Sequence, residues 1–344
     1  MRVSVIIRSK DEADRLRLTL HSLACQTRRA EVVVVNDGSR DHTAGVLDSA
    51  RFFLPLTVIH HETPHGRSGA ANVGVAAASG DIVIFLDGDT LAGPDFVARH
   101  VEAHSARGGV VARGEPYNLR CTRFLLDPEI GTPRPGEEDR VRRLDPVELA
   151  RLRVTREELR GDFSAIDRRA QPGVYPGAGP RRLYEIEKDA LHHHPNCRVL
   201  WAAASGVNMS VRREDFLRVG GFHHDLDINE HRELALKLCH RGARMVPVEA
   251  RTYHMTHRTG WRDPMQQTRW EQVFYKAHPI PAVKLLVVFW ASLSYGTLIP
   301  PDYRISSLPE LEAAAAGNTR VDYDVVRRVI AGLARADGEP VLPA

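Results

Sequence analysis

The stretch Ile82-Val-Ile-Phe-Leu-Asp-Gly-Asp-Thr90 is an apolar run that ends in two carboxylates, Asp87 and Asp89, separated by Gly88. β-Branched and aromatic residues fill the run, which predicts a strand buried on both faces, as in a parallel sheet. Open α/β sheets bind their ligands at the carboxyl ends of such strands. Two neighbouring carboxylates repel each other unless a cation lies between them, and a divalent ion bound to phosphate is a common solution. A solvated Asp-Gly turn is the alternative.

The residues before and after this run alternate between strand and helix patterns with short connections. Strands are expected at residues 3–7, 31–35, 56–59 and 82–86, and helices at 12–23, from about 41, at 68–78 and at 94–104. This order predicts an α/β fold in which a parallel sheet is covered on both faces.

The pattern weakens between residues 113 and 198. A charged, helical stretch at 137–160 and a Pro/Gly loop at 171–180 are expected there. We interpret this segment as an insertion, either a mobile lid or a solvated elaboration without a role. Regular structure returns at 199–204 and 207–211, followed by a helix at 229–240 and a strand at 243–248. The chain is therefore divided into residues 1–112, 113–198, 199–258 and a helical extension, 259–344.

Composition excludes several classes of protein. The 47 basic residues nearly balance the 44 acidic ones in the 344-residue chain, which gives no case for nucleic-acid binding. The four cysteines form no CxxC pair, so we expect neither a zinc framework nor disulfides, and a reducing cytoplasm fits. The apolar segment 283–299 is short for a membrane span, and a buried or interfacial helix is expected there, with peripheral membrane contact left open.

Four polar groups follow expected strands or open expected helices at one edge of the sheet. They are Arg8-Ser-Lys-Asp-Glu12, Asn36-Asp-Gly-Ser39, Gly66-Arg-Ser-Gly-Ala-Ala-Asn-Val-Gly74, and the pair around Gly88. The third group has small residues at a helix start, where a phosphate can approach the backbone, and Arg67 adds a positive charge. Each group alone is also compatible with a turn or a helix cap.

Taken in order, these groups resemble the nucleotide-sugar half of the family 2 glycosyltransferases, which have the GT-A fold. The resemblance is strong over residues 1–112 and continues at 199–250 in Ser205-Gly-Val-Asn-Met-Ser-Val-Arg-Arg213 and Val219-Gly-Gly-Phe222. It implies a Rossmann-like, mostly parallel sheet flanked by helices, with the insertion and the C-terminal helical extension added to it.

The resemblance also implies roles for the matching residues. Asp37 should hold the base, most often uracil, in a pocket that Ser9 and Glu12 line beside Arg8. Arg67 should reach the diphosphate or ribose from the helix start that contains Asn72. Asp87 should contact ribose or metal next to Gly88, and Asp89 should bind Mn²⁺ or Mg²⁺ between the two phosphates. His254 is a further expected metal ligand, and His257 a weaker one.

The base that deprotonates the acceptor is where the chain departs from the family pattern. The expected Glu-Asp pair falls on Glu230-His231, so that His replaces Asp. Glu230, His231 and Asp227, from the preceding loop, are the three candidates, and Glu230 is preferred because a carboxylate preserves the family chemistry.

These observations predict an inverting, metal-assisted glycosyltransferase that moves a sugar from a nucleotide diphosphate, expected to be UDP, to a hydroxyl or amine of a small molecule or glycan. A sugar-phosphate nucleotidyltransferase and a non-catalytic nucleotide-sugar-binding module are the alternatives. The sequence leaves open whether the chain acts as a monomer or a homodimer.

Overall fold

A computed structural model describes residues 1–106, 108–173, 178–257, 269–318 and 321–336. Within them, nine strands form one main sheet in the order β3-β2-β1-β4-β10-β6-β11-β5, with β9 paired to β6. The strands are β1 Val3–Ser9, β2 Glu31–Asp37, β3 Leu56–His61, β4 Ile82–Asp87, β5 Thr90–Ala92, β6 Val110–Leu119, β9 Gln171–Pro172, β10 Met209–Arg212 and β11 Arg244–Met255. A separate hairpin joins β7 Leu125–Asp127 and β8 Thr132–Pro133.

The sheet is mostly parallel, as predicted. Strands β1, β2, β3 and β4 run parallel, and β11 runs parallel to β6. Strand β10 is antiparallel to both β4 and β6, and β5 is antiparallel to β11. The α/β architecture and the mostly parallel sheet expected from the sequence are confirmed.

Helices cover both faces of the sheet because successive side chains of each strand point to opposite sides. Ile6 belongs to one core, and its neighbours Val5 and Ile7 belong to the other. The second core is closed by α1 Ala13–Ala24, α2 Thr43–Ala50 and α4 Phe96–Ala106, and the first by α3 Gly66–Ala77, α10 Arg213–Arg218 and α11 Glu230–His240. Each of these helices therefore packs with one apolar stripe against the sheet.

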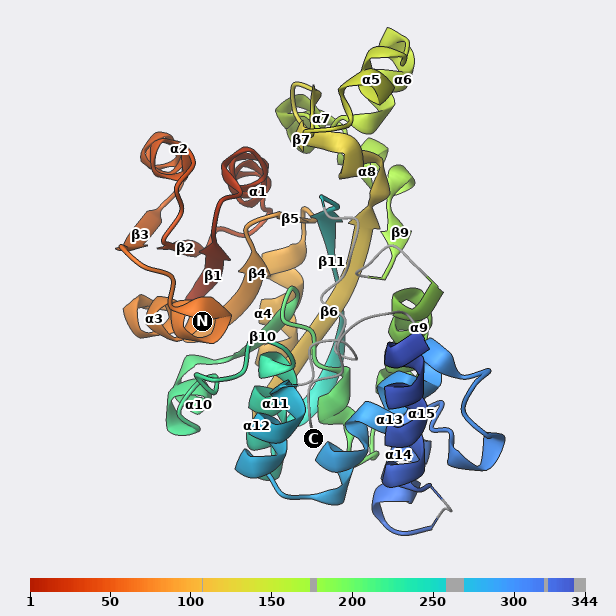
Figure 1. The fold of residues 1–344 in the computed structure, drawn as a ribbon. Helices are drawn as coiled ribbons and strands as arrows, with labels where there is room; N and C mark the ends of the chain where they lie inside the picture. Colours follow the sequence, from red (N-terminus) through yellow and green to blue (C-terminus); the bar gives the residue numbers. More distant parts are fainter. Residues whose placement is uncertain (107, 174–177, 258–268, 319–320, 337–344) are drawn as a thin grey trace.

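The segment 113–198 holds more structure than the sequence suggested. The charged stretch forms short helices, α5 Glu138–Arg142, α6 Pro146–Leu152 and α7 Arg156–Gly161, followed by α8 Phe163–Arg169. The predicted loop at 171–180 is wrong at both ends, since β9 pairs with Tyr117 and Asn118 of β6, and α9 Ala178–His193 begins before the loop was expected to end. In Figure 1, α5–α8 project beyond the carboxyl ends of the central strands.

The C-terminal helices lie at the opposite end of the molecule (Figure 1). They are α12 Arg269–Ala277, α13 Pro281–Tyr295, α14 Leu308–Ala315 and α15 Tyr323–Ala336. Helix α13 is buried along most of its length, with Leu286, Val288 and Phe289 at most 1% exposed, which confirms a buried helix at this position. In the described part of the chain, no helix combines the length and apolarity needed to cross a bilayer.

Candidate functional site

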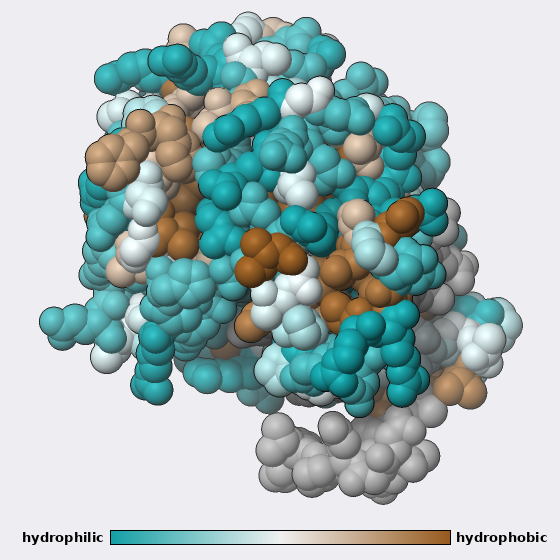
Figure 2. Space-filling view, turned by 90° about the horizontal axis from the view of Figure 1, so that it is seen from above, coloured by the Kyte–Doolittle hydropathy of each residue, from teal (hydrophilic) through white to brown (hydrophobic). Residues whose placement is uncertain are grey.

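A cleft of about 550 Å³ lies over the carboxyl ends of β1, β2 and β4. The polar groups that line it include Arg8, Ser9, Glu12, Asp37, Arg67, Asp87, Asp89, Asp227 and His257. Seen from above, the molecule is largely hydrophilic, with hydrophobic side chains in smaller areas between the polar ones (Figure 2). Most residues singled out from the sequence are thus brought together on one face.

Asp89 lies in this cleft beside two histidines. Its Oδ2 is 2.8 Å from Nε2 of His257 and 3.3 Å from Nε2 of His254. One ligand atom from each of the three residues lies within 4.8 Å of the other two. A carboxylate and two imidazoles are a donor set that accepts a divalent cation such as Mn²⁺. His257, the weaker candidate from the sequence, therefore joins His254 beside Asp89.

The electrostatics of this cluster favour a charged carboxylate. Burial raises the pKa of Asp89, but His254 and His257 outweigh it and hold the pKa well below its usual value. Burial lowers the pKa of His257, against the raising effect of its hydrogen bond to Asp89. Both shifts keep the groups in the protonation states that bind a metal, an ionised carboxylate and a neutral imidazole.

Asp87, which was also expected at the metal, has a different partner. Its Oδ1 accepts a hydrogen bond from Nε of Arg8 at 3.1 Å, and Nη2 of Arg8 is 2.9 Å from Oε1 of Glu230. Although burial alone would lower it, the pKa of Arg8 is raised by these two carboxylates. The Asp89 cluster of three residues does not include Asp87, whose carboxylate lines the cleft next to it.

Asp37 is fixed by the chain around it. Backbone N–H groups of His65 and Gly66 donate to Oδ1 at 2.8 Å and Oδ2 at 3.0 Å, and Nδ1 of His61 donates to Oδ1 at 2.8 Å. Gly66 has φ +78°, a backbone conformation that residues with a Cβ rarely adopt. The carboxylate therefore cannot turn away from the cleft without losing these bonds.

The three candidate bases occupy different surroundings. Asp227 is exposed and lines the cleft, and a Cβ added to Gly66 would lie 3.0 Å from its Oδ1. Glu230 is only 2% exposed and paired with Arg8, which holds its pKa below the usual value despite the raising effect of burial. Neither Glu230 nor His231 is among the residues that line the cleft.

His231 is held by its sequence neighbour. Nη1 of Arg232 donates to Nε2 of His231 at 2.9 Å, which leaves the ring proton on Nδ1. Nδ1 in turn lies 3.6 Å from Oε2 of Glu230. Burial is the main cause that lowers the pKa of His231. A neutral ring whose acceptor nitrogen is already occupied is poorly placed to take a proton from an acceptor molecule.

Three other residues predicted on the donor side are placed as follows. The Asn72 amide bonds the backbone of Phe222 through both its nitrogen and its oxygen, and Asn72 is not among the residues that line the cleft. A Cβ added to Gly88 would lie 2.7 Å from Oγ of Ser9, so glycine is required for this close approach. Oε1 of Glu12 lies 3.7 Å from Nε2 of His257, which brings Glu12 close to the Asp89 cluster in the cleft that Asp37 also lines.

Two arginines in the cleft were not anticipated. Arg15 donates from its three guanidinium nitrogens to the carbonyls of Leu125, Leu126 and Met255, and burial lowers its pKa to about 10. Arg134, which follows β8, also lines the cleft, as does Leu126. The β7–β8 hairpin of the insertion therefore forms one wall, a placement that no local pattern in residues 125–134 signals.

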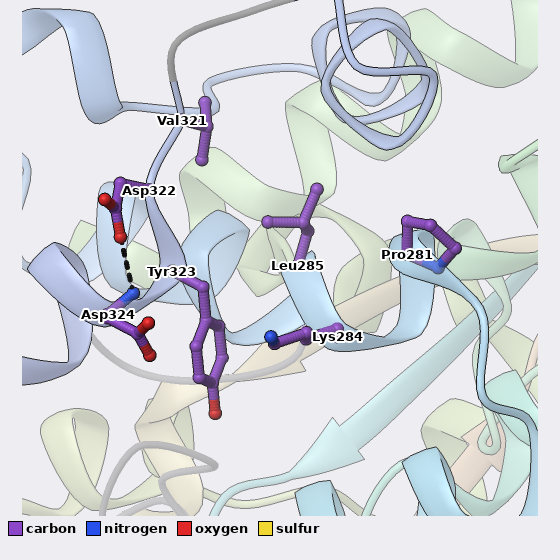
Figure 3. Close-up of a pocket in the computed structure, with 7 residues that line it drawn as sticks. All are labelled: Pro281, Lys284, Leu285, Val321, Asp322, Tyr323 and Asp324. Carbon is purple, nitrogen blue, oxygen red and sulfur yellow. Dashed lines mark hydrogen bonds between the residues drawn. The ribbon is translucent and has the colours of Figure 1, made fainter.

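A second hollow lies between α13 and the start of α15, and Figure 3 shows its lining. Oδ1 of Asp322 accepts a bond from the backbone N–H of Asp324 at 2.8 Å, and the ammonium of Lys284 lies 4.8 Å from the ring centroid of Tyr323. These groups are engaged with each other, and the hollow is far from the strand ends in Figure 1. The strand-end cleft is therefore the better candidate site.

Comparison with known proteins supports the resemblance seen in the sequence. Residues 4–153 match the model of the family described as Glycosyl transferase family 2. Validoxylamine A glucosyltransferase of Streptomyces hygroscopicus subsp. jinggangensis is 30% identical over 230 residues, which cover 65% of this chain and 47% of that protein. Uncharacterized glycosyltransferase YfnE of Bacillus subtilis is 36% identical over 116 residues, 33% of this chain and 30% of that protein. The chain thus spans between about a third and a half of the length of these relatives.

Solved structures share the fold. Residues 1–349 of TarS from S. aureus align over 100% of this chain and 99% of theirs, with a TM-score of 0.56 and 15% identity. The mannosyltransferase PcManGT from Pyrobaculum calidifontis, solved with GDP-Man and Mn²⁺, aligns over 97% of this chain and 80% of its own, with a TM-score of 0.52 and 19% identity. At these identities the likeness establishes the GT-A fold and nothing finer.

Proposed function

Because residues 4–153 match the family described as Glycosyl transferase family 2, we propose that the chain is a member of this family and transfers a sugar from a nucleotide-diphosphate donor to a hydroxyl or amine acceptor. The observation that carries the proposal is the convergence in one cleft of Asp37, the Asp89 cluster and Asp227. A base-binding carboxylate, a cation site for the diphosphate and a basic group for the acceptor are the three parts that such a transfer needs.

The donor would lie across the strand ends. Its base would meet Asp37, and its diphosphate would lie between Arg67 and the Asp89 cluster. Arg15 and Arg134 add positive charge on the insertion side of the same cleft. The related structures bound to UDP-GlcNAc and to GDP-Man support a nucleotide-sugar donor without deciding its base or sugar.

Asp89, His254 and His257 would hold a divalent cation. Two nitrogen ligands favour Mn²⁺ over Mg²⁺, which prefers an all-oxygen shell. Bound there, the ion would supply Lewis-acid stabilisation of the leaving diphosphate.

Asp227 would act as the general base. The acceptor oxygen or nitrogen would attack the anomeric carbon from the side opposite the diphosphate while its proton passes to the Asp227 carboxylate. The bond from the anomeric carbon to the phosphate oxygen would break, and the nucleoside diphosphate would leave with the electron pair. This single displacement inverts the anomeric configuration. Glu230 would instead orient Arg8, and through it Asp87.

The division of the chain would then follow these roles. Residues 1–112 would bind the donor, and residues 199–258 would supply the base and the two histidines. Residues 113–198 would add Leu126 and Arg134 as a wall facing both substrates, and residues 259–344 would support α11 from behind. The acceptor would be a small molecule or a glycan.

A direct test is release of nucleoside diphosphate from a panel of nucleotide sugars with and without Mn²⁺. Wild-type protein should release it slowly by hydrolysis even without an acceptor, and Asp89→Ala should abolish both this release and metal-dependent donor binding. Asp48→Ala serves as the control, because the Asp48 side chain is 76% exposed on α2 and is not among the residues that line the cleft. Unchanged release by Asp89→Ala would refute the cation site.

The same assay separates the alternatives. Turnover that requires pyrophosphate would identify a sugar-phosphate nucleotidyltransferase, and donor binding without any release would identify a non-catalytic binding module. Either result would refute sugar transfer.

A further inference from the structure

His61 lies directly beside the carboxylate that is proposed to bind the base. Strands β2 and β3 are parallel, and their register pairs Asp37 with His61 and Asn36 with His60. The side chains of His61 and Asp37 are each 8% exposed. The neighbouring His60 points to a different partner, since its Nδ1 lies 3.1 Å from Nδ2 of Asn36. His61 therefore bonds the carboxylate of the base subsite from a position that does not itself line the cleft, and His60 contacts Asn36 instead.

The hydrogen bonds to Asp37 can be counted against its capacity. A carboxylate offers about four lone-pair positions, two on each oxygen. Oδ1 accepts from Nδ1 of His61 and from the backbone N–H of His65, both at 2.8 Å, which fills its two positions. Oδ2 accepts from the backbone N–H of Gly66 at 3.0 Å. Among the described residues, one position on Oδ2 is thus left for a ligand.

One acceptor position suits some bases and not others. Uracil presents one imide N–H between two carbonyls, and hypoxanthine likewise presents a single N–H. Guanine presents two adjacent N–H groups, from the ring and the exocyclic amine, and these need both oxygens of a carboxylate. A buried N–H left without an acceptor costs much more than a matched hydrogen bond gains.

We propose that His61 makes the base subsite selective for bases with a single N–H, uracil above all, and discriminates against guanine. This inference rests on the proposed function, because it takes the nucleotide of the donor to bind at Asp37. His61 acts by occupying one of the two positions of Oδ1, the other being taken by the N–H of His65, and so removes the second acceptor that guanine would use.

The surroundings of His61 keep it in this position. Its ring stacks on the ring of His65, with centroids 4.0 Å apart and planes 25° from parallel. On the other side of Asp37, a Cβ added to Gly38 would lie 2.9 Å from Pro64, so the turn after β2 packs tightly against the loop before α3. A bound base therefore cannot displace the histidine by a small shift of either loop.

The experiment compares the binding of UDP, IDP and GDP, each with Mn²⁺, to three forms of the full chain by calorimetry. IDP and GDP differ only in the exocyclic amine. The ratio of their affinities therefore measures the effect of the second N–H group at constant ring size. His61→Phe keeps a ring that can stack on His65 but removes the donor. His61→Asn is the matched control, because its side-chain amide can still donate to Oδ1.

We expect the wild type to bind UDP most tightly and IDP roughly tenfold more tightly than GDP. In His61→Phe the ratio of the affinity for IDP to the affinity for GDP should fall to about one or reverse. In His61→Asn this ratio should stay near the wild-type value. Thermal unfolding verifies that each variant is folded. If His61→Phe does not fold, His61→Leu, which also lacks the donor, replaces it in the comparison.

An IDP-to-GDP ratio that is the same in wild type and His61→Phe would overturn the role of His61. So would exclusion of both purine nucleotides by all forms, because ring size would then select the base. If UDP, IDP and GDP all fail to bind the wild type, the proposed function itself fails, a result distinct from the other two.

Discussion

Replacing Asp227 and Glu230 separately should split two roles that the sequence could not tell apart. Asp227→Asn removes the proposed proton acceptor from the cleft and leaves its size unchanged. A general base is commonly worth about 10²- to 10⁴-fold in rate, or roughly 3–5 kcal/mol in activation free energy. We expect kcat to fall by about that factor, with the affinity for nucleoside diphosphate nearly unchanged, because the proposed role of Asp227 is to take the proton of the acceptor rather than to hold the nucleotide.

Glu230→Gln should act mainly on stability. The Glu230 carboxylate is 2% exposed and 2.9 Å from Nη2 of Arg8, so its neutralisation leaves a buried cation with one carboxylate fewer. Breaking a buried pair costs about 3–5 kcal/mol, an upper figure here because Asp87 still pairs with Arg8 at 3.1 Å. The melting temperature should drop by several degrees. The kcat of the folded variant should stay within about tenfold of the wild-type value, since the proton acceptor is intact.

The measurements are steady-state release of nucleoside diphosphate with a competent acceptor and thermal unfolding of each variant. His231→Gln is a third arm, for which a small change in kcat is expected because Nε2 of His231 is already bonded to Arg232. If Asp227→Asn keeps more than about a tenth of the activity while Glu230→Gln melts like the wild type and is inactive, Glu230 is the base and the reasoning from burial is wrong.

Two further predictions concern stability. Gly114→Ala should lower the free energy of unfolding by about 3 kcal/mol or prevent folding, because its Cβ would lie 2.0 Å from Oδ1 of Asn208 and 2.6 Å from the carbonyl oxygen of Ala250. Gly45→Ala on α2 has open space around it and should raise the free energy of unfolding by about 0.5–1 kcal/mol. Urea unfolding checks both variants. Burial lowers the pKa of His100 and of His104 from 6.5 to about 4, so the unfolded chain binds more protons than the folded chain between these two pH values. The free energy of unfolding should therefore fall by about 3 kcal/mol for each histidine as the pH drops from 6.5 to 4. In urea unfolding at stepwise pH, His100→Asn should lose less stability over this range than the wild type, and an equal loss would contradict the assignment.

The first half of the fold could be predicted because its information is local. Each of the first four strands is a short run rich in β-branched and aliphatic residues, and the structure extends the predicted ends by only one or two residues in β1, β2, β3 and β4. The same locality located Asp37 and Asp89, which directly follow or end such runs. Parallel strands then bring these ends to one edge without further information.

The partners of Asp89 could not be predicted with the same ease. His254 reaches it because β11 pairs with β5, in a register that sets His254 opposite Thr90. This pairing joins residues more than 160 positions apart, and no periodicity in either short stretch specifies it. The predicted strand at 243–248 also ended before Met255, so both histidines were placed after the strand rather than one within it. His254 was identified only through the family resemblance.

The preference for Glu230 rested on the family pattern and did not consider a cation from another strand. Arg8 lies near the end of β1 and was counted with the donor side, yet its guanidinium contacts both Glu230 and Asp87. Burial and this pairing set the surroundings of Glu230, and neither can be read from residues 227–231. The position of Asp227 against Gly66 is likewise a contact between two distant loops.

The segment 113–198 shows why a weak sequence pattern does not imply independence from the site. Glu187 of α9, 4% exposed, pairs through its two oxygens with Nη2 of Arg113 at 2.6 Å and Nη2 of Arg232 at 2.8 Å. Arg232 also bonds His231 and lies over the Trp290 ring of α13, 4.8 Å from its centroid. One buried carboxylate thus joins β6, α9, α11 and the C-terminal helices. Because an unpaired charge in such a position is costly, α11 depends on α9 for its place beside the cleft, and the proposed division of the chain describes roles in catalysis rather than separable folding units.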